Sequence, residues 1–206
     1  GVMATSPLSI TGANATIPAP IGGLNTRDSV DLLPPTDAIR LDNFFPARSH
    51  VQVRNGYDDH ATGLPSTVES LMIYNSGTAN TMFAASGSAV YDATSSGAIG
   101  SAVITSLTNA QFQWTNITTA GGAFLWICNG ADAPRHWNGS AWATPTLSGV
   151  TAANIVNVTL FKERLFFVFN NSLTFGFLPV NAVAGTVAEF DLGSVFGHGG
   201  QLQAIG

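Results

Sequence analysis

Charge is the property that this sequence has least of. Charged residues make up 9% of the 206 residues, far below the roughly 25% of an ordinary globular domain. Lys162 is the sole lysine, and the net charge is -5. A protein that holds nucleic acid through its phosphates needs a basic surface, so the composition argues against that class of function. The polarity comes instead from 21 Thr, 17 Ser and 15 Asn, which are typical of strands and turns.

Cysteine and long apolar runs are also scarce. Cys128 is the one cysteine, so an internal disulfide framework is excluded. It ends the longest apolar run, the six residues from Ala123, and a thiol in such a run is expected to be buried and inert. That run is far shorter than the ~20 residues of a transmembrane helix. No positive charge precedes Arg27, so the basic region of a signal peptide is missing.

Prolines and charged residues gather near the N-terminus. We expect residues 1–65 to form an extended arm, because its prolines interrupt regular structure. The sequence predicts one short helix in this arm, which begins at Thr36 or Asp37 as the N-cap and is stopped by Pro46. Ten of the 19 charged residues lie between Arg27 and Asp59, which marks this segment as a docking region.

From about residue 66 the pattern changes to short apolar runs separated by turn residues. Asn129-Gly130 and Asn138-Gly139 indicate tight hairpin turns, in which both central residues adopt positive φ. The expected strands are Val68–Tyr74, Met82–Ala85, Ala89–Asp92, Ala102–Thr105, Gln111–Ile117, Phe124–Asn129, Arg135–Asn138, Ile155–Leu160, Leu165–Asn170 and Leu173–Phe177.

These expected strands repeat along the chain. Asn116-Ile117-Thr118 with Phe124-Leu125-Trp126 matches Asn157-Val158-Thr159 with Leu165-Phe166-Phe167 at an ungapped offset of 41. An offset of 42 places Met82-Phe83 under Phe124-Leu125. A period of about 40–45 residues that holds four strands is typical of a β-propeller blade.

The predicted fold class is therefore all-β, with propeller-like four-stranded repeats of about 41–45 residues. About three repeats fit into residues 66–206, whereas a closed propeller needs at least about four blades. We expect the propeller to be partial and the chain to continue past Gly206, since Gln201 to Ile205 reads as the start of another strand. A β-sandwich remains the alternative.

No catalytic motif stands out, and we expect no enzyme activity, cofactor or metal. The P-loop, the dinucleotide-binding glycine pattern, paired cysteines, the zinc-protease motif and the nucleophile elbow do not occur. Asp58-Asp59-His60 is expected to be a solvated loop, because neighbouring residues in an extended chain point to opposite faces. His136 is expected to be a structural histidine of a strand.

Several spaced blocks together resemble one family. The bend at Pro20–Asn25, the segment Leu33–Pro46 and the strand Val51–Tyr57 resemble the start of bacteriophage tail tube and nozzle proteins. Cys128–Gly139 and Arg164–Val168 resemble the propeller repeats of the same proteins. The resemblance is to the N-terminal portion of proteins that are usually longer, and it covers nearly all of this chain.

The resemblance implies a structural component of a short-tailed phage tail, located in the virion. Such proteins form a ring, commonly sixfold, below the portal and the adaptor, so the expected partners are copies of the chain and other tail and connector proteins. The lumen of the ring passes the DNA during ejection without specific binding, which suits an acidic chain. Two other classes stay open, a carbohydrate-binding or adhesin propeller with Trp114, Trp126, Trp137 and Trp142, and a propeller hydrolase.

The arm is also the expected contact surface between subunits. Arginine is favoured in interface ion pairs because its planar fork binds carboxylates through two hydrogen bonds. Two adjacent phenylalanines at the exposed end of a short helix cannot both face a small local core. The expected interface residues are Arg27, Arg40, Phe44, Phe45, Arg48 and Arg54. The alternative is an arm that folds back on its own repeats and covers a strand edge.

Overall fold

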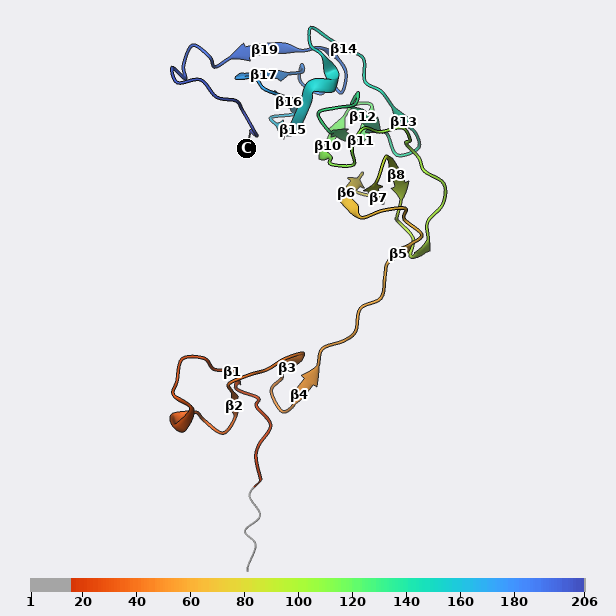
Figure 1. Cartoon of the computed structure of the whole chain (residues 1–206). Coiled ribbons are helices and arrows are strands. Elements are labelled where there is room, and N and C mark those ends of the chain that lie inside the picture. The colour runs from red at the N-terminus through yellow and green to blue at the C-terminus, as the bar shows by residue number, and fades with distance from the viewer. Residues whose placement is uncertain (1–15, 206) are drawn as a thin grey trace, which may run out of the picture. The chain divides into compact units, whose positions relative to one another are not determined.

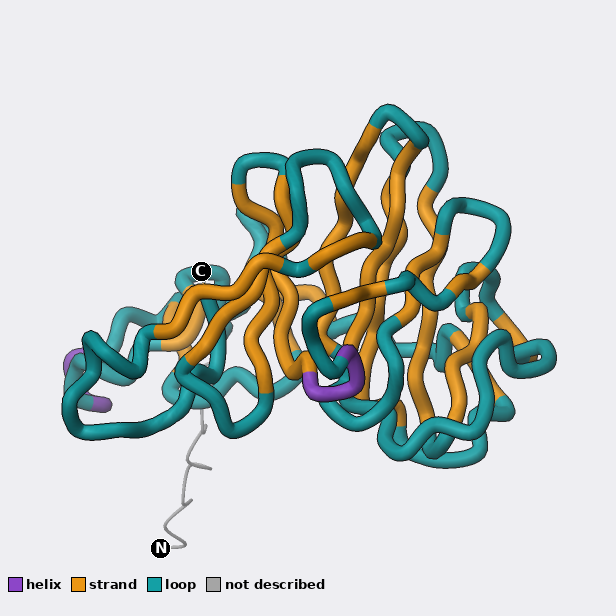
Figure 2. The backbone as a smooth tube through the Cα atoms, turned by 90° about the horizontal axis from the view of Figure 1, so that it is seen from above, coloured by secondary structure: helices purple, strands orange, loops and turns teal. Residues whose placement is uncertain are grey.

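The computed structural model describes residues 16–205, and these residues fall into two compact units. The N-terminal unit ends at Asp58, and the sheet unit begins at Asp59 (Figure 1). Strands dominate, and the helical segments are two single 3₁₀ turns, Val30–Leu32 (η1) and Ala152–Asn154 (η2) (Figure 2). Among the described residues, no helix is long and apolar enough to cross a membrane.

The N-terminal unit contains two pairs of short strands around the 3₁₀ turn. The parallel pair joins β1 (Gly23–Leu24) to β2 (Asp37–Ala38). The antiparallel pair joins β3 (Phe44–Pro46) to β4 (Val51–Val53). Two-stranded pairs of this size are marginally stable on their own.

The short helix predicted between Thr36 and Pro46 is wrong. Asp37 and Ala38 are in an extended strand, because their backbone pairs with Gly23 and Leu24. Asn43 has φ of +60°, a left-handed conformation that interrupts a right-handed helix and that asparagine tolerates better than most residues. Pairing with a strand 14 residues earlier competes with the helix that the N-cap residues predict, and local sequence spacing does not reveal this pairing.

The sheet unit is built from three antiparallel sheets that follow one another along the chain. The first sheet is β6-β7-β8, the second is β10-β11-β12-β13, and the third is β15-β16-β17-β19. Their bounds are β6 Val68–Asn75, β7 Asn80–Ser86, β8 Ala89–Asp92, β10 Gln113–Thr119, β11 Gly122–Cys128, β12 Arg135–Trp137, β13 Trp142–Ala143, β15 Ile155–Phe161, β16 Arg164–Phe169, β17 Thr174–Phe177 and β19 Ala188–Asp191.

Two small parallel pairs complete the sheet unit. One joins β5 (Ala61–Thr62) to β9 (Gly97–Ala98), and the other joins β14 (Leu147–Ser148) to β18 (Gly185–Thr186). These pairs tie the connections between sheets to segments far along the chain.

The first core lies between the first and second sheets. Met72 and Phe83 of the first sheet pack with Leu125 and Ile127 of the second, and all four side chains are completely buried. Asn116 also joins these sheets through its side-chain amide, which accepts a hydrogen bond from the Asn75 amide at 3.1 Å and donates to the Ile73 carbonyl at 2.8 Å. The amide thus satisfies two strand-edge backbone groups.

The second core lies between the second and third sheets. Trp126 of β11 packs on Phe167 of β16 with 4.9 Å between ring centroids, and both side chains are completely buried. The indole N–H of Trp126 donates to the Val183 carbonyl at 3.1 Å, so the buried polar group is satisfied. The second sheet is therefore covered on both faces.

Apart from two, the expected strands are found, Ala89–Asp92 with the predicted bounds and the others with shifted ends. Residues 102–105 contribute only an isolated bridge, in which Ile104 pairs with Val90 at the open edge of the first sheet. Residues 201–205 form no strand, although the Leu202 amide donates to the Ser172 carbonyl at 2.8 Å. The two Asn-Gly turns also differ from the prediction, because Gly130 and Gly139 adopt positive φ but Asn129 and Asn138 do not.

The ungapped repeat offset of 41 is wrong by one residue between the second and third sheets. Their hairpins close on the pairs Thr119–Gly122 and Phe161–Arg164. Counted from these pairs, Leu125 corresponds to Phe167 rather than Phe166, and Leu125 and Phe167 indeed both face the preceding sheet. Because side chains alternate along a strand, the slip moves Phe166 to the opposite face.

Candidate interaction surfaces

The described residues offer no cluster of metal-ligating side chains. No group of three or more His, Cys, Asp or Glu side chains in residues 16–205 is arranged to hold a metal ion. Cys128 is buried in the second core, and this burial raises the pKa of its thiol far above the ordinary value. A thiol that stays protonated is a poor nucleophile, so its position supports a packing role.

The two histidines considered in the sequence, His60 and His136, each contact another part of the fold. His60 makes a hydrogen bond between its Nε2 and the Ala93 carbonyl at 2.9 Å. His136 lies on β12 with its ring edge against Phe124, 5.4 Å between centroids. Burial lowers the pKa of His136, so the neutral imidazole prevails near neutral pH.

The turn after β11 is held by a carboxylate. Asp132 accepts hydrogen bonds from the backbone amide and hydroxyl of Thr108, both at 2.8 Å, and from the side chain of Asn129 at 2.6 Å. Burial acts to raise the pKa of Asp132, but these hydrogen bonds and Arg135 lower it below its usual value. This polar network fixes the loop in one of the blocks that carry the family resemblance.

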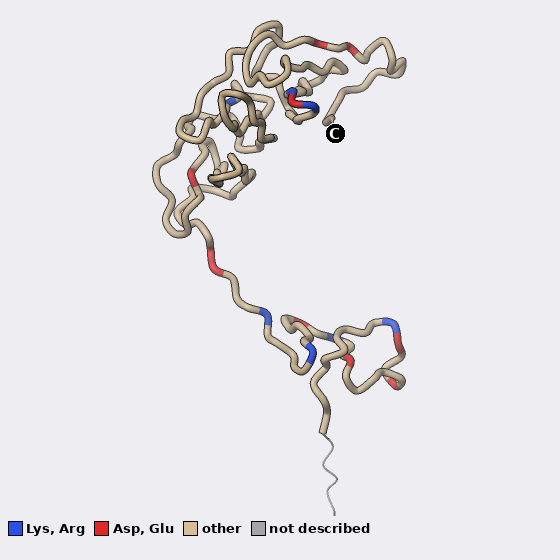
Figure 3. The backbone as a smooth tube through the Cα atoms, turned by 180° about the vertical axis from the view of Figure 1, so that it is seen from behind, with Lys and Arg blue, Asp and Glu red and all other residues tan. Residues whose placement is uncertain are grey.

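The arginines of the N-terminal unit point into solvent and pair only locally. Arg27 contacts Asp28 at 3.2 Å and Arg40 contacts Asp42, and the arginine side chains are 90% and 82% exposed. Arg48 and Arg54 are exposed as well. Exposed pairs between near neighbours contribute about 0–1 kcal/mol, so these guanidinium groups stay available to another surface. Figure 3 shows how densely the charges fall in this unit compared with the sheets.

Phe44 and Phe45 lie on a hairpin rather than at the end of a helix. Phe44 pairs with Val53 and Phe45 with Gln52 across β3 and β4. Neighbouring residues of a strand point to opposite faces, and both phenylalanines are exposed, Phe45 by 59%. Each face of the hairpin therefore presents one aromatic ring.

Exposed apolar side chains are a general property of the N-terminal unit. Among residues 16–58, Gly23 is the only residue classed as buried. The large apolar side chains that are exposed there are Ile17, Ile21, Leu24, Val30, Leu32, Ile39, Phe44, Phe45, Val53 and Tyr57. Exposed apolar side chains that gather into a patch are a mark of a binding region.

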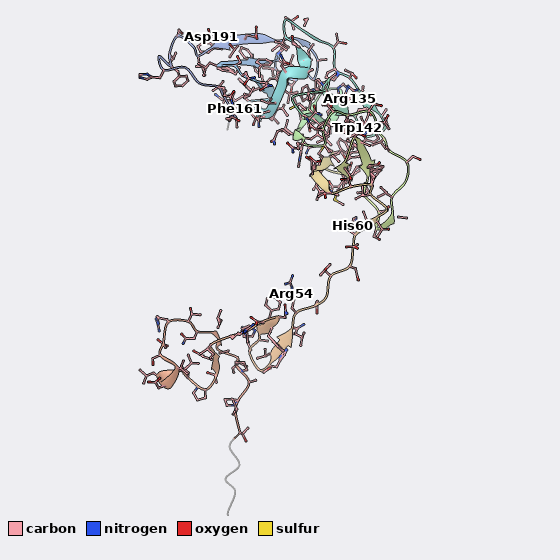
Figure 4. All side chains as sticks on the ribbon, in the orientation of Figure 1. Arg54, His60, Arg135, Trp142, Phe161 and Asp191 are labelled. Atoms are coloured by element: carbon pink, nitrogen blue, oxygen red, sulfur yellow. The ribbon has the colours of Figure 1, made fainter. Side chains whose placement is uncertain are left out.

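A second apolar surface was not found from the sequence. It lies on the third sheet, on the side away from the second sheet, and its rings form a chain of contacts with centroids 5.4–6.2 Å apart. We call this surface the aromatic face, and it consists of Phe161, Phe166, Phe175, Phe177 and Phe190. The alternation of Phe175 and Phe177 was the available signal. Figure 4 labels Phe161, one of these five residues.

The four tryptophans all take part in the cores. Trp126 is completely buried, and Trp114, Trp137 and Trp142 are partly buried against the first core. Trp137 and Trp142 both pack edge-on against Phe83, with centroids 5.2 and 4.9 Å away. A stacking platform for sugars requires an exposed ring, and none of the four is among the exposed large side chains of the described residues.

Comparison with known proteins gives no relative. No protein-family model matches the chain. No curated protein and no solved structure matches it either.

Proposed function

We propose that this chain is a ring-forming structural subunit of a short-tailed bacteriophage tail, and that its three sheets are blades of a partial β-propeller. The blade interpretation is supported by the stacking of consecutive sheets through two apolar cores. It is also supported by the position of β6, β10 and β15, the first strand of each sheet, on the concave side of the arc (Figure 1). Propeller blades are four-stranded and stack in this order around an axis.

The observation that carries the functional proposal is the character of the N-terminal unit. It holds nine of the 19 charged residues of the sequence, and most of its large apolar side chains are exposed. A segment that covers so little of its own apolar surface gains stability when it is covered by another surface. This is the expected behaviour of an arm that joins neighbouring subunits of a ring.

The family resemblance indicates the assembly to which such a subunit would belong. The blocks that carry it fall in both units, from the bend at Gly23 through the loop that Asp132 fixes to β16. In this proposal copies of the chain form the ring, other tail and connector proteins lie above and below it, and the genome passes through its lumen. The net charge of -5 keeps that passage free of tight phosphate contacts.

The two other functional classes have less support. A sugar-binding propeller needs exposed aromatic platforms, and the tryptophans contribute to the core instead. A hydrolase needs carboxylates that converge on one cleft, and the acidic residues of residues 59–205 that make resolved contacts, such as Asp132 and Glu163, bond to loops.

The proposal is tested with the purified chain and two arm variants, Arg40→Ala and Phe44→Ala. Negative-stain images of the wild-type chain should show rings with a central channel. The variants should abolish the rings and leave the thermal midpoint of the sheet unit unchanged. Val180→Ala removes an equally exposed apolar side chain from the sheet unit and serves as the matched control, which should keep the rings.

Two results would contradict the proposal. If both arm variants lower the thermal midpoint while assembly is normal, the arm folds back on its own sheets. If the wild-type chain stays a monomer at high concentration and binds glycans, the adhesin class is correct.

A further inference from the structure

The aromatic face of the third sheet is the structural counterpart of a surface that the fold covers elsewhere. Counted from the closing pairs of the two hairpins, Phe166 corresponds to Phe124 and Val168 to Trp126. In the second sheet, Phe124 and Trp126 are covered by the third sheet. In the third sheet, Phe166 is half-buried and Val168 is buried, and the open part of the same side lies at Phe161 and Phe190, which are 59% and 52% exposed. The covered counterpart shows that another β-sheet fits this kind of surface.

The aromatic face is bordered by positive charge. The Arg164 guanidinium lies over the Phe177 ring at 5.7 Å, and the Lys162 ammonium lies 5.3 Å from the centroid of Phe161. Glu163 lies between them in the sequence, but its carboxylate accepts a hydrogen bond from Asn181 at 3.2 Å. Two cations of this chain therefore sit on or beside one apolar surface.

The opposite end of the stack presents an apolar surface with negative charge. On the first sheet, the side away from the second sheet carries Leu71, Ile73, Met82 and Tyr91, because the alternate residues Met72 and Phe83 fill the first core. We call this surface the aliphatic face; Leu71 and Ile73 are 54% and 44% exposed. Glu69 is exposed on the same strand, β6.

The two faces differ in charge, and the aromatic face carries a hollow. Thr159, Leu160, Phe161 and Phe166 line a hollow on the third sheet together with Ile205. Contact between the aromatic and the aliphatic face would bring Glu69 of one copy toward Lys162 and Arg164 of the other. Contact between two aromatic faces would instead bring Lys162 and Arg164 of both copies together, and like charges across an interface are unfavourable.

We propose that the aromatic face of one chain docks on the aliphatic face of a second copy. Because the two faces lie at opposite ends of one stack, the contact is head to tail. Two copies joined through both contacts would close a ring to which residues 59–205 contribute six sheets, within the range of about four to eight known for propellers. The inference rests on the stacking of the sheets and is independent of the tail function.

The test measures self-association of the full chain by sedimentation velocity over a concentration series. All proteins carry Arg40→Ala and Phe44→Ala, so that contacts through the arm do not contribute. This background should sediment with twice the 21.3 kDa mass of the chain. Phe161→Asp and Leu71→Asp should each raise the dissociation constant of the dimer at least about tenfold, since each buries a charge in the contact.

Two further measurements separate this geometry from other modes of association. An equimolar mixture of Phe161→Asp and Leu71→Asp should form heterodimers, because one intact face of each kind remains. Glu69→Arg and Arg164→Glu should each weaken the dimer, and their combination should recover part of the loss. Val180→Asp, a charge placed on an exposed apolar position outside both faces, should have no effect.

Three outcomes would overturn the inference. They are a monomeric background protein, a dimer that Phe161→Asp weakens while Leu71→Asp does not, and failure of the mixture to associate. Wild-type rings that persist while the background protein is monomeric would overturn the docking of the faces and leave the proposed tail function standing.

Discussion

The two units of this chain use similar apolar residues in opposite ways. Phe83 in the sheet unit is completely buried, whereas Phe45 in the N-terminal unit is 59% exposed. Phe83 lies on a strand with a second sheet packed against it, and Phe45 lies on a two-stranded hairpin. Burial of a strand residue requires another layer, and a two-stranded pair supplies none.

The difference teaches where each unit obtains its stability. The sheet unit gains from apolar burial between its layers, which contributes about 25 cal/mol for each Å² removed from water. The N-terminal unit relies on local polar contacts, such as those of Asn25 with Asp28 and Asp37, both at 2.9 Å. A typical hydrogen bond of this kind contributes only about 0.5–1.5 kcal/mol.

The largest effect expected is the loss of a core ring. Phe167→Ala should lower the free energy of unfolding by about 3–5 kcal/mol, because the cavity forms between two sheets that cannot both relax. Phe45→Ala should change it by less than about 0.5 kcal/mol. Urea titrations of both variants measure the contrast. A loss under about 1 kcal/mol at Phe167 would mean that the space between these sheets is not the core.

A smaller effect is expected from adding a single methyl group. A Cβ at Gly176 would lie 2.6 Å from Val187 Cγ1 and 2.8 Å from Phe169 Cζ. Gly176→Ala should therefore cost about 1–3 kcal/mol through overpacking. Gly56 has nothing within 4 Å of the same position, so Gly56→Ala should be neutral or slightly stabilising. Equal thermal midpoints for the two variants would contradict the packing described for the third sheet.

The smallest effect concerns the dependence of stability on pH. Burial raises the pKa of Cys128 in the folded state, whereas the unfolded thiol ionises near about pH 8.5. Above that pH the unfolded chain releases a proton that the folded chain keeps, so stability should fall by about 1.4 kcal/mol for each pH unit.

The matched control is Cys128→Ala, whose loss of stability above pH 8.5 should be smaller by this amount. The pH profiles of wild type and variant are compared by urea unfolding between about pH 7 and 10. Parallel profiles would show that the thiol is already ionised, or solvated, in the folded chain.

Most of the strands were predictable because their signal is local. Val68–Asn75 and Arg164–Phe169 contain apolar runs bounded by turn residues, and such runs need no partner to be recognised. The helix at Thr36–Pro46 failed because a strand pairing with Gly23 and Leu24 competes with it. The aromatic face was not predicted, for a related reason. The assignment of Phe166 to one side of the sheet depends on the repeat register, which the self-match misplaced by one residue.

The six interface residues were predicted from the sequence as a set, and the structure shows that all of them are exposed. Arg40 and Phe44 are both exposed in the N-terminal unit. The charge pattern that selected them is a property of composition, and it is visible without coordinates. Their role in assembly stays a prediction, because it depends on a second chain.

The sequence by itself determined the all-β class, the sparse charge and the concentration of cations near the N-terminus, since these depend on residue type and on neighbours along the chain. Only the tertiary structure decided which side of each strand is covered. The second sheet has both faces buried, while the third has one face open at Phe161 and Phe190. The reason is physical: alternation places side chains on two faces, but the layer that packs against each face is a different sheet of the chain.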